Sequence, residues 1–247
     1  MINFKEFRSK YSRVLVTGGA GFIGGAMIRR LLIDTDVFIF NLDKLSYASD
    51  LRGIEDITQN LPKNGTERYK LLKVDLIDFQ STLNAVKESN PDIIFHLAAE
   101  SHVDRSIDSP LLFAQSNVLG TCNLLQASRN HWENLSKDRK ENFRFQHIST
   151  DEVFGSLSDS GKFSESTPYD PRSPYSASKA SSDHFVNAWH HTYGLPVIST
   201  NCSNNYGPWQ FPEKLIPVVI MKALAMQDIP LYGNGSNIRD WLYVEDH

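Results

Sequence analysis

Thr17-Gly18-Gly19-Ala20-Gly21-Phe22-Ile23-Gly24 is the stretch that decides the fold of this chain. The β-branched segment 13–17 before it is typical of a buried strand, and segment 22–33 after it has the spacing of an amphipathic helix. A glycine-rich turn between a strand and a helix can hold a pyrophosphate, because unpaired N–H groups at the helix N-terminus attract the anion. The stretch therefore predicts a dinucleotide-binding βαβ unit. Each of three glycines has an expected role. Gly18 allows the tight turn, Gly21 allows the close approach of the anion, and Gly24 allows the helix to pack closely on the strand.

Short apolar runs and amphipathic segments alternate along the rest of the chain. The apolar runs are expected to be strands covered on both faces, at 13–17, 37–42, 69–74, 92–97, 143–149 and 196–201. The expected helices span 22–33, 79–88, 111–131 and 175–193. This alternation predicts an α/β protein with a doubly wound parallel Rossmann sheet.

The pattern changes in the last third of the chain. A helix is expected at 213–227 and short strands at 230–232 and 239–244, after which no closing helix follows. We expect an NAD-binding Rossmann domain with active-site segments over 12–203, and over 204–247 the start of a smaller carboxyl-terminal substrate domain, apparently truncated.

Composition excludes several classes of protein. The 247 residues carry a formal net charge of −4 with mixed signs, which argues against nucleic acid or an anionic membrane as partner. Cys122 and Cys202 are far apart and are expected to be buried reduced thiols, with neither a disulfide nor a metal site. The first twelve residues lack a signal-peptide pattern and no apolar run could span a bilayer, so a soluble cytoplasmic protein is expected.

Two further segments have plain structural interpretations. Phe185, Trp189 and Tyr193 recur at four-residue spacing and are expected to form an apolar stripe in the core. The charged run 136–142 is expected to be a solvated helix end and loop.

Asp43 ends the second expected strand, about twenty residues past the glycine turn. A carboxylate there accepts hydrogen bonds from ribose hydroxyls and repels a 2′-phosphate, which favours NAD over NADP, although Lys44 beside it would partly offset that repulsion. An aspartate that merely ends the strand is the alternative. Asp75 follows the third strand and is placed to touch the adenine, while the small Leu97-Ala98-Ala99 run leaves room for the cofactor.

Tyr175 and Lys179 start a predicted helix just after Pro174 and share one helix face at i and i+4 spacing. An ammonium near the phenol, together with the positive nicotinamide, lowers the pKa of the tyrosine so that it can act as a base. This spacing alone is weak, since it arises by chance in many helices. It gains weight from its position downstream of Thr150, at the carboxyl end of the fifth expected strand, where parallel sheets bind ligands.

Two adjacent carboxyl groups, Asp151 and Glu152, follow Thr150. They are either a polar loop after a strand or a pair for acid–base work beyond hydride transfer. In the second case, one carboxyl would be protonated and donate to a leaving hydroxyl, while the other removes a carbon-bound proton.

The combined motifs resemble the dTDP-glucose 4,6-dehydratases of the bacterial rhamnose pathway, within the extended short-chain dehydrogenase/reductase superfamily. The Asp-Glu pair distinguishes this family from the related 4-epimerases and decarboxylases. The resemblance covers nearly all of the chain after the first dozen residues, and it is carried by the segments 17–24, 41–47 (NLDKLSY), 97–106 (LAAESHVDRS), 149–155 (STDEVFG), 175–179, 201–208 (NCSNNYGP), 211–217 (FPEKLIP) and 238–247 (IRDWLYVEDH).

The resemblance implies a hydro-lyase reaction in which bound NAD is used and regenerated. Tyr175, assisted by Lys179 and Thr150, would take the proton of the C4 hydroxyl while a hydride passes to NAD. Glu152 would then remove the C5 proton and Asp151 would protonate the C6 hydroxyl, so that water leaves. The hydride finally returns to C6.

The resemblance also implies two sets of contacts. The cofactor set is Gly18, Gly21, Phe22, Ile23, Gly24, Asp43, Lys44, Leu45, Ser46, Asp75, Leu76, Leu97, Ala98, Ala99, Glu100, Ser101, Ser116, Tyr175, Lys179 and Asn205. The substrate set is Ser101, Thr150, Asn204, Lys214, Leu215, Pro230, Leu231, Tyr232 and Arg239. Lys214 and Arg239 suit the diphosphate, and Ser116 stands where the family usually has threonine. Asn117 is interpreted either as ordering water or backbone near Lys179 or as a buried structural asparagine.

Members of the family are usually homodimers, which implies a four-helix interface through helices 111–131 and 175–193. They are also longer than this chain, so we expect the stretch to bind NAD but to turn over substrate poorly or not at all. Two alternatives stay open. One is a dehydratase or epimerase for a UDP- or other nucleotide sugar, and the other is an NAD-binding regulatory protein with an inactive site.

Overall fold

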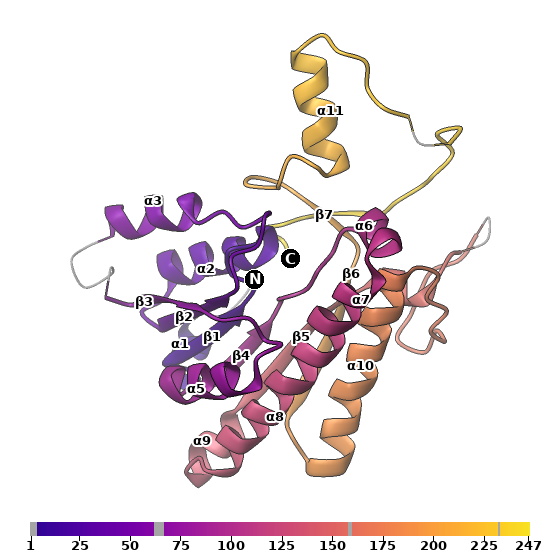
Figure 1. Cartoon of the computed structure of the whole chain (residues 1–247). Coiled ribbons are helices and arrows are strands. Elements are labelled where there is room, and N and C mark those ends of the chain that lie inside the picture. Colours follow the sequence, from indigo (N-terminus) through magenta and orange to yellow (C-terminus); the bar gives the residue numbers. More distant parts are fainter. Residues whose placement is uncertain (1–3, 62–66, 158–159, 232) are drawn as a thin grey trace.

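A six-stranded parallel sheet forms the centre of the molecule in the computed structural model, which describes residues 4–61, 67–157, 160–231 and 233–247 (Figure 1). The strand order is β3-β2-β1-β4-β5-β6. Chain order reverses between β1 and β4, which creates the switch point where doubly wound sheets bind ligands. The strands are β1 Arg13–Thr17, β2 Phe38–Asp43, β3 Tyr69–Lys73, β4 Ile93–His96, β5 Arg144–Thr150 and β6 Val197–Cys202.

Helices pack on both faces of the sheet and enclose two apolar cores. One core joins strand residues such as Phe145 to Leu124 of α8 and Val186 of α10. The other joins the opposite face to Ile28 of α2 and Ile54 of α3. The predicted doubly wound Rossmann fold is confirmed. The helices are α1 Phe4–Lys10, α2 Phe22–Asp34, α3 Arg52–Asn60, α5 Phe79–Ser89, α6 Val103–Asp108, α7 Pro110–Phe113, α8 Gly120–Glu133, α9 Lys137–Asn142, α10 Pro174–Tyr193 and α11 Leu215–Leu224.

Local sequence explains the long helix α10. Ser173 and Ser176 form a reciprocal capping box at its start, and Pro174 occupies the first turn, where a missing N–H does no harm. Gly194, with φ of 75°, ends the helix in the left-handed region. The start of α10 is thereby fixed, and with it the position of Tyr175.

The predicted helix 111–131 is wrong as a single element. The chain forms α7, then a π-helix (η1, Ala114–Leu119), then α8. The hydroxyls of Thr121 and Ser182 both donate to the carbonyl of Asn117, at 2.5 and 2.7 Å, and so compete with the regular helical hydrogen bonds. Such widened turns are rare and often occur at functional sites.

Other predicted boundaries differ from the structure by a few residues at most. The charged run 136–142, expected to be a helix end and loop, instead contains the short helix α9. Prediction missed α1, α3, α6 and the strand β7 (Asn204–Tyr206), which pairs with β8 (Trp241–Tyr243). The strand predicted at 230–232 is not found at Pro230 and Leu231, and Tyr232 lies outside the described residues.

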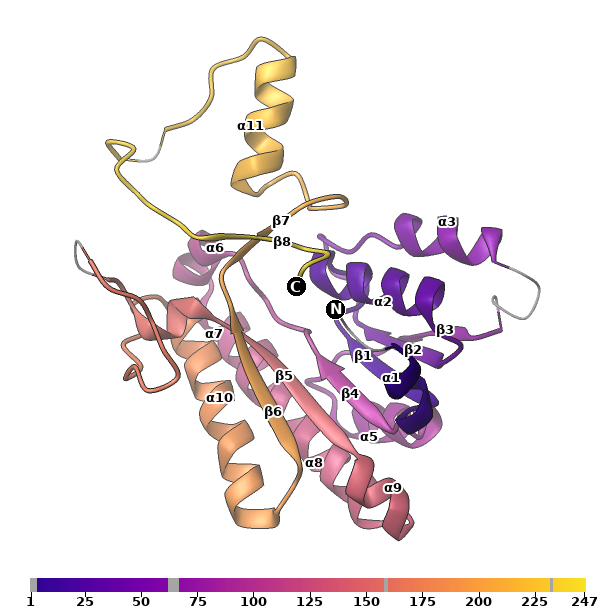
Figure 2. The same cartoon turned by 180° about the vertical axis from the view of Figure 1, so that it is seen from behind.

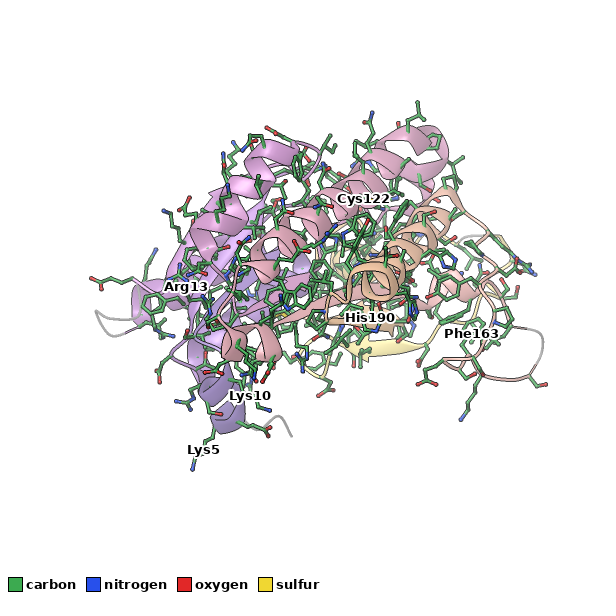
Figure 3. All side chains as sticks on the ribbon, turned by 90° about the horizontal axis from the view of Figure 1, so that it is seen from below. Lys5, Lys10, Arg13, Cys122, Phe163 and His190 are labelled. Atoms are coloured by element: carbon green, nitrogen blue, oxygen red, sulfur yellow. The ribbon has the colours of Figure 1, made fainter. Side chains whose placement is uncertain are left out.

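The expected burial of the aromatic stripe on α10 is wrong. Phe185 and Tyr193 are 38% and 39% exposed, because α10 turns its other face, with Val186, toward the core. Trp189 packs against the core as a partly buried residue. Both cysteines are free, as expected, but half-buried rather than buried, and Cys122 lies on the helical layer (Figure 3).

Residues after β7 extend away from the sheet. Helix α11 projects from the molecule, and none of its residues is buried (Figure 2). The chain then returns through β8, and directly after it Val244 is buried and donates its N–H to the carbonyl of Tyr206. Among the described helices, none has both the length and the apolar character needed to cross a membrane.

Candidate active site

The glycine turn forms a cradle that side chains would fill. Gly18 has φ of +72°, and a Cβ there would lie 2.7 Å from the Cα of Ala98. A Cβ on Gly24 would collide with the carbonyl oxygen of Gly18. Gly21 precedes α2 with extended backbone and no side-chain cap, so the first N–H groups of the helix are free of capping groups. The cradle fits the pyrophosphate of a dinucleotide.

Asp43 is buried at the end of β2 and holds the glycine turn. One carboxylate oxygen accepts the N–H of Ala20 at 2.9 Å, and the other accepts the N–H of Leu45 at 2.8 Å. Lys44 forms an ion pair with Glu100 across the cleft at 2.7 Å. The positive charge beside Asp43 is therefore already paired. Lys44 is then less able to offset the repulsion between Asp43 and the 2′-phosphate of NADP.

A pocket of about 370 Å³ adjoins the turn and is lined by residues 20–22, 48–50 and 209–212, together with Arg29 and Arg52. Trp209, which sequence reasoning missed, packs so closely on Gly53 that a Cβ there would lie 2.8 Å from its ring. The guanidinium groups of Arg29 and Arg52 lie 5.9 and 5.8 Å from the ring centroid. No local pattern marks this contact, because its partners are distant in sequence.

Thr150, Asp151 and Glu152 lie where β5 passes into the 3₁₀ turn η2 (Asp151–Phe154). The hydroxyl of Thr150 accepts the N–H of Glu152 at 3.2 Å and donates to Asp151 at 3.3 Å. Burial raises the pKa of Asp151. Burial and then the charge of Asp151 raise the pKa of Glu152, while Arg239 and Lys214 oppose that rise. A carboxyl pair with raised pKa values is suited to proton transfer near neutral pH.

Tyr175 and Lys179 are both buried on the first turns of α10. The ammonium of Lys179 donates to the carbonyl of Ile148 on β5 at 2.9 Å. Burial, followed by the charge of Glu152, raises the pKa of Tyr175, so the phenol stays protonated at neutral pH until positive charge is added nearby. Bound oxidised nicotinamide would supply such a charge.

Asn117 sits in the π-helix and connects two predicted segments. Its side chain accepts the N–H of Glu100 at 2.8 Å and donates to the carbonyl of the same residue at 3.0 Å. It also donates to the hydroxyl of Ser178, beside Lys179, at 2.9 Å. Asn117 is 1% exposed, as expected of a buried structural asparagine, and the backbone that it orders is that of Glu100.

The other predicted cofactor residues are distributed over the same edge of the sheet. Leu76 is buried after β3, Asp75 is exposed beside it, and Ser116 is half-buried in the π-helix. Asn205 is buried in β7, where its side chain bonds the imidazole of His247 at 2.9 Å. The remaining predicted cofactor residues are half-buried, except for exposed Ser101: Phe22, Ile23, Leu45, Ser46, Leu97, Ala98 and Ala99.

The predicted substrate residues divide into two groups. Lys214 donates to the carbonyl of Ser101 at 3.2 Å, and Lys214 and Arg239 lie close enough to Glu152 to lower its pKa. Asn204 lies in β7, which pairs with β8 in a separate two-stranded sheet. Residues of the second group are not brought to the carboxyl pair: Leu215 is half exposed at the start of α11, and Pro230 and Leu231 are exposed beyond that helix (Figure 1).

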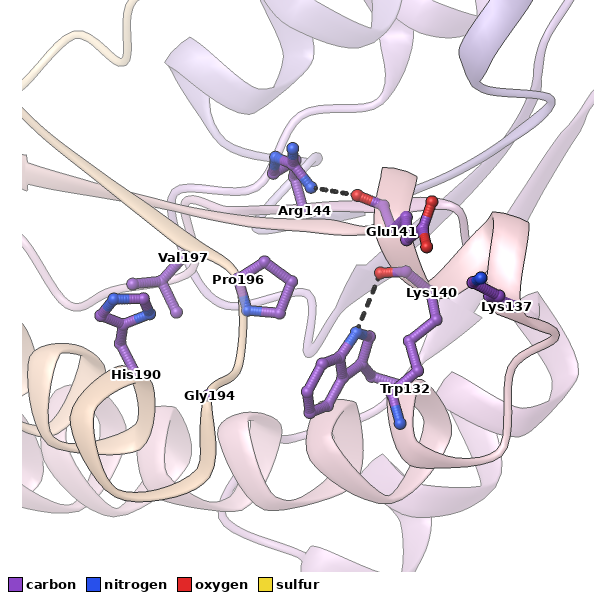
Figure 4. A pocket seen from close by; sticks show the side chains of 9 residues that line it. All are labelled: Trp132, Lys137, Lys140, Glu141, Arg144, His190, Gly194, Pro196 and Val197. Atoms are coloured by element: carbon purple, nitrogen blue, oxygen red, sulfur yellow. Dashed lines mark hydrogen bonds between the residues drawn. The ribbon is translucent and has the colours of Figure 1, made fainter.

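A larger pocket, of about 630 Å³, lies at the amino ends of β5 and β6, near Arg144 and Val197 (Figure 4). Lys137, Lys140 and His190 also line it. Parallel sheets bind ligands at the opposite, carboxyl edge, so this pocket is separate from the candidate active site. Within the described ranges, no cluster of His, Cys, Asp and Glu side chains is placed to hold a metal ion.

The glycine cradle, the switch-point edge and the Tyr175–Lys179 pair define the class: a Rossmann-fold protein of the short-chain dehydrogenase/reductase type. A family model described as GDP-mannose 4,6 dehydratase matches residues 15–247. The chain belongs to this family of nucleotide-sugar dehydratases, and the resemblance seen in its motifs is confirmed.

Individual relatives agree with this assignment. A probable dTDP-glucose 4,6-dehydratase of Sinorhizobium fredii is 54% identical, with 95% of this chain and 65% of the relative covered. A dTDP-glucose 4,6-dehydratase of Escherichia coli is 53% identical, with 95% and 66% covered. The dTDP-glucose 4,6-dehydratase DesIV of Streptomyces venezuelae, crystallised with NAD, is 42% identical with a TM-score of 0.84, with 95% and 69% covered. The chain thus spans just under two thirds of the length of the first two relatives.

Proposed function

We propose that this chain is the cofactor-binding and catalytic part of an NAD-dependent dTDP-glucose 4,6-dehydratase, with residues 12–203 as the Rossmann domain and 204–247 as the start of the substrate domain. The observation that carries the proposal is the half-buried carboxyl pair, Asp151 and Glu152, which directly follows β5, the strand that the ammonium of Lys179 contacts. An oxidoreductase that only moves a hydride has no need of two such carboxyls.

NAD is the proposed cofactor, and it would accept a hydride from C4 of the sugar and return it to C6. The cradle at Gly18 and Gly24 has no side chains that would exclude a pyrophosphate, and Asp43, which holds the turn through the N–H of Ala20, would accept hydrogen bonds from the adenosine ribose. The paired state of Lys44 favours NAD over NADP. The related enzymes crystallised with NAD support the same choice.

Each polar residue at the edge has a proposed role. Tyr175 takes the proton of the C4 hydroxyl, with Lys179 as the nearby positive charge and Thr150 as a hydrogen-bonding partner. Glu152 removes the C5 proton and Asp151 donates a proton to the departing C6 hydroxyl, as the resemblance to the dTDP-glucose 4,6-dehydratases implies. Burial raises the pKa of both carboxyls, which suits them to proton transfer near neutral pH.

The test is a screen of nucleotide-diphospho-glucoses with the protein in excess over substrate, so that even slow turnover is detected. We expect dTDP-glucose to give a 4-keto-6-deoxy product with alkaline absorbance and without net NADH. Asp151→Asn and Glu152→Gln should slow water loss about 10²-fold or more, with bound NAD unchanged. Undiminished water loss in both variants would refute the assigned roles, and an epimerised product would favour the related epimerase activity.

We also propose a homodimer through the face that α7, α8 and α10 present. These helices expose apolar side chains: Leu111 is 77%, Leu112 42% and Phe185 38% exposed. Helices α8 and α10 lie side by side, so a second copy would complete a four-helix interface (Figure 1). Light scattering should give twice the chain mass of 28.0 kDa, and Leu111→Asp should shift the protein toward the monomer. A cytoplasmic location stays a prediction from the sequence.

A further inference from the structure

Asp183 is a buried carboxylate that the proposed reaction does not use. It lies on α10 one turn beyond Lys179, with 1% of its surface exposed. It accepts three hydrogen bonds, from His147 Nε2 at 2.9 Å, Ser149 Oγ at 2.7 Å and the Tyr169 hydroxyl at 2.9 Å. A carboxylate with three donors is held in its ionised form, as charge-assisted hydrogen bonds require.

The three donors do not neutralise this charge. Burial, and then the charge of Lys179, lowers the pKa of His147 to about 4, so the imidazole is neutral and donates from Nε2. Among the described residues, His147 Nδ1 has no hydrogen-bonding partner, which agrees with the neutral form. Burial, followed by the charge of Asp183, raises the pKa of Tyr169 to about 12, so the phenol is neutral too.

Lys179 lies over the same part of β5. Its ammonium donates to the carbonyl of Ile148, and Asp183 contacts the side chains of the two flanking residues, His147 and Ser149. Residues at i and i+4 on a helix lie about 5–6 Å apart at Cβ, so the two charges face one short stretch of strand. Buried charges of opposite sign interact even without direct contact, since water screens them little, and the charge of Asp183 raises the pKa of Lys179 against the effect of burial.

We propose that Asp183 is a positioning residue, the buried counter-ion that keeps Lys179 protonated beside Tyr175. The ammonium would otherwise be an isolated buried cation, and burial lowers the pKa of Lys179 while the charge of Asp183 raises it. This role rests on the proposed function only for its catalytic consequence, because the charge of Lys179 can be measured without turnover.

Other titratable groups around the ammonium do not replace Asp183. His96 on β4 is neutral, because burial holds its pKa well below the usual value. Burial raises the pKa of the Cys202 thiol on β6, which keeps it uncharged. Asp151 and Glu152, in the turn after β5, have raised pKa values of their own, and burial is the main cause for each. The remaining neighbour, Tyr175, is a protonated phenol, and His184 lies exposed on α10 itself.

The test is the titration of Lys179 followed by ¹³Cε NMR of lysine-labelled protein, with the signal assigned by its loss in Lys179→Arg. In Asp183→Asn we expect the midpoint to fall by about one pH unit or more, the size that Coulomb's law gives for a partly screened buried pair. Tyr169→Phe is the matched control, because it removes one hydrogen bond but keeps the charge of Asp183, so the midpoint should stay. Asp183→Glu keeps the negative charge, so the Lys179 midpoint should return most of the way to its value in the unaltered protein.

Activity provides a second reading. If the proposed reaction is correct, the alkaline limb of kcat for dTDP-glucose should move to lower pH in Asp183→Asn by the same amount as the NMR midpoint. An unchanged Lys179 midpoint in folded Asp183→Asn would overturn the counter-ion role, whatever the activity. If that variant does not fold, the ¹³Cγ signal of Asp183 in the unaltered protein is the test, because it reports whether the carboxyl is ionised. A carboxyl that is protonated at pH 7 would overturn the proposal. If the Lys179 midpoint falls as expected but dTDP-glucose is not turned over, the result counts against the proposed function and leaves the counter-ion role standing.

Discussion

The sheet with its helices and the segment after β7 differ in how they use apolar residues. Phe145, Leu124 and Ile28 are fully buried between the sheet and its helices. In the later segment, Leu224 is 82% and Met226 93% exposed. Apolar burial is the dominant favourable contribution to folding, so the stability of this chain resides in the sheet and its helices.

The later segment contributes charge to the site rather than stability. It contacts the first part through the Tyr47 hydroxyl, which donates to Glu213 at 2.9 Å, and through Lys214, which donates to the carbonyl of Ser101. The charges of Lys214 and Arg239 reach Glu152. One part therefore holds the carboxyl pair in place, and charges of the other part lower the pKa of Glu152.

The largest expected effect is on the free energy of unfolding. Phe145→Ala should lower it by about 3–5 kcal/mol, because it leaves a cavity in a close-packed core. Leu224→Ala, the matched apolar truncation on exposed α11, should change it by less than about 0.5 kcal/mol. Urea unfolding followed by circular dichroism measures both. A comparable loss in free energy of unfolding for both variants would show that α11 is buried in solution. The two parts of the molecule would then not differ in how they use apolar residues.

The next effect separates two glycines that both have positive φ. Gly18→Ala should abolish detectable NAD binding and lower the free energy of unfolding by about 2 kcal/mol or more, since the new Cβ meets the backbone of Ala98. Gly233→Ala places its Cβ in open space, so it should cost only about 1 kcal/mol from the strained φ and leave NAD binding intact. Calorimetric titration with NAD checks the first difference. If Gly18→Ala and Gly233→Ala bind NAD with equal affinity, the glycine cradle is not part of the NAD site.

Sequence patterns predicted the sheet well because their causes are local. Continuous apolar runs and a glycine turn are enough to place β1 and α2, and the boundaries differ by at most a few residues. The carboxyl pair and the Tyr175–Lys179 pair were predicted for the same reason, since each is a short motif at a strand or helix end.

Features that depend on distant partners were not predictable. In the π-helix the carbonyl of Asn117 accepts the hydroxyls of Thr121 and Ser182, and no pattern within 111–131 signals the contact with Ser182, which comes from another helix. The packing of Trp209 on Gly53 and the three hydrogen bonds to Asp183 likewise join segments far apart in the chain. The aromatic stripe on α10 was misjudged because periodicity identifies an apolar face but does not say what covers it.

A smaller effect on the free energy of unfolding is expected from the N-termini of the helices, which differ between the sheet layer and the segment after β7. Helix α10 has the Ser173 capping box, whereas α11 starts at Lys214 without a side-chain cap. Ser173→Ala should lower the free energy of unfolding by about 1 kcal/mol, the usual loss for an N-cap serine. Ser181→Ala, inside the same helix, is the matched control and should be neutral or slightly stabilising, because alanine is the better helix former. Thermal unfolding compares them, and equal effects would mean that the box does not stabilise α10.

The smallest effect has a sign that depends on pH. Because burial raises the pKa of Asp151, the folded protein binds its proton more tightly than the unfolded chain does. The charged carboxylate therefore destabilises the fold once the pH exceeds the ordinary aspartate value of 3.8 and reaches neutrality. Asp151→Asn should raise the free energy of unfolding at pH 7 by a few tenths up to about 1 kcal/mol, and this gain should vanish as the pH falls below that ordinary value.

Asp228→Asn, at an exposed position beyond α11, is the matched control and should change the free energy of unfolding by less than about 0.5 kcal/mol, the usual range for surface substitutions. Denaturant unfolding at pH 7 and at acid pH measures both variants. A destabilised Asp151→Asn at pH 7 would mean that the carboxylate forms favourable contacts in the fold, and its assignment as the proton donor would then lose its physical basis. A gain confined to neutral pH would show that the first part of the molecule keeps a destabilising carboxyl at its site, as functional sites often do.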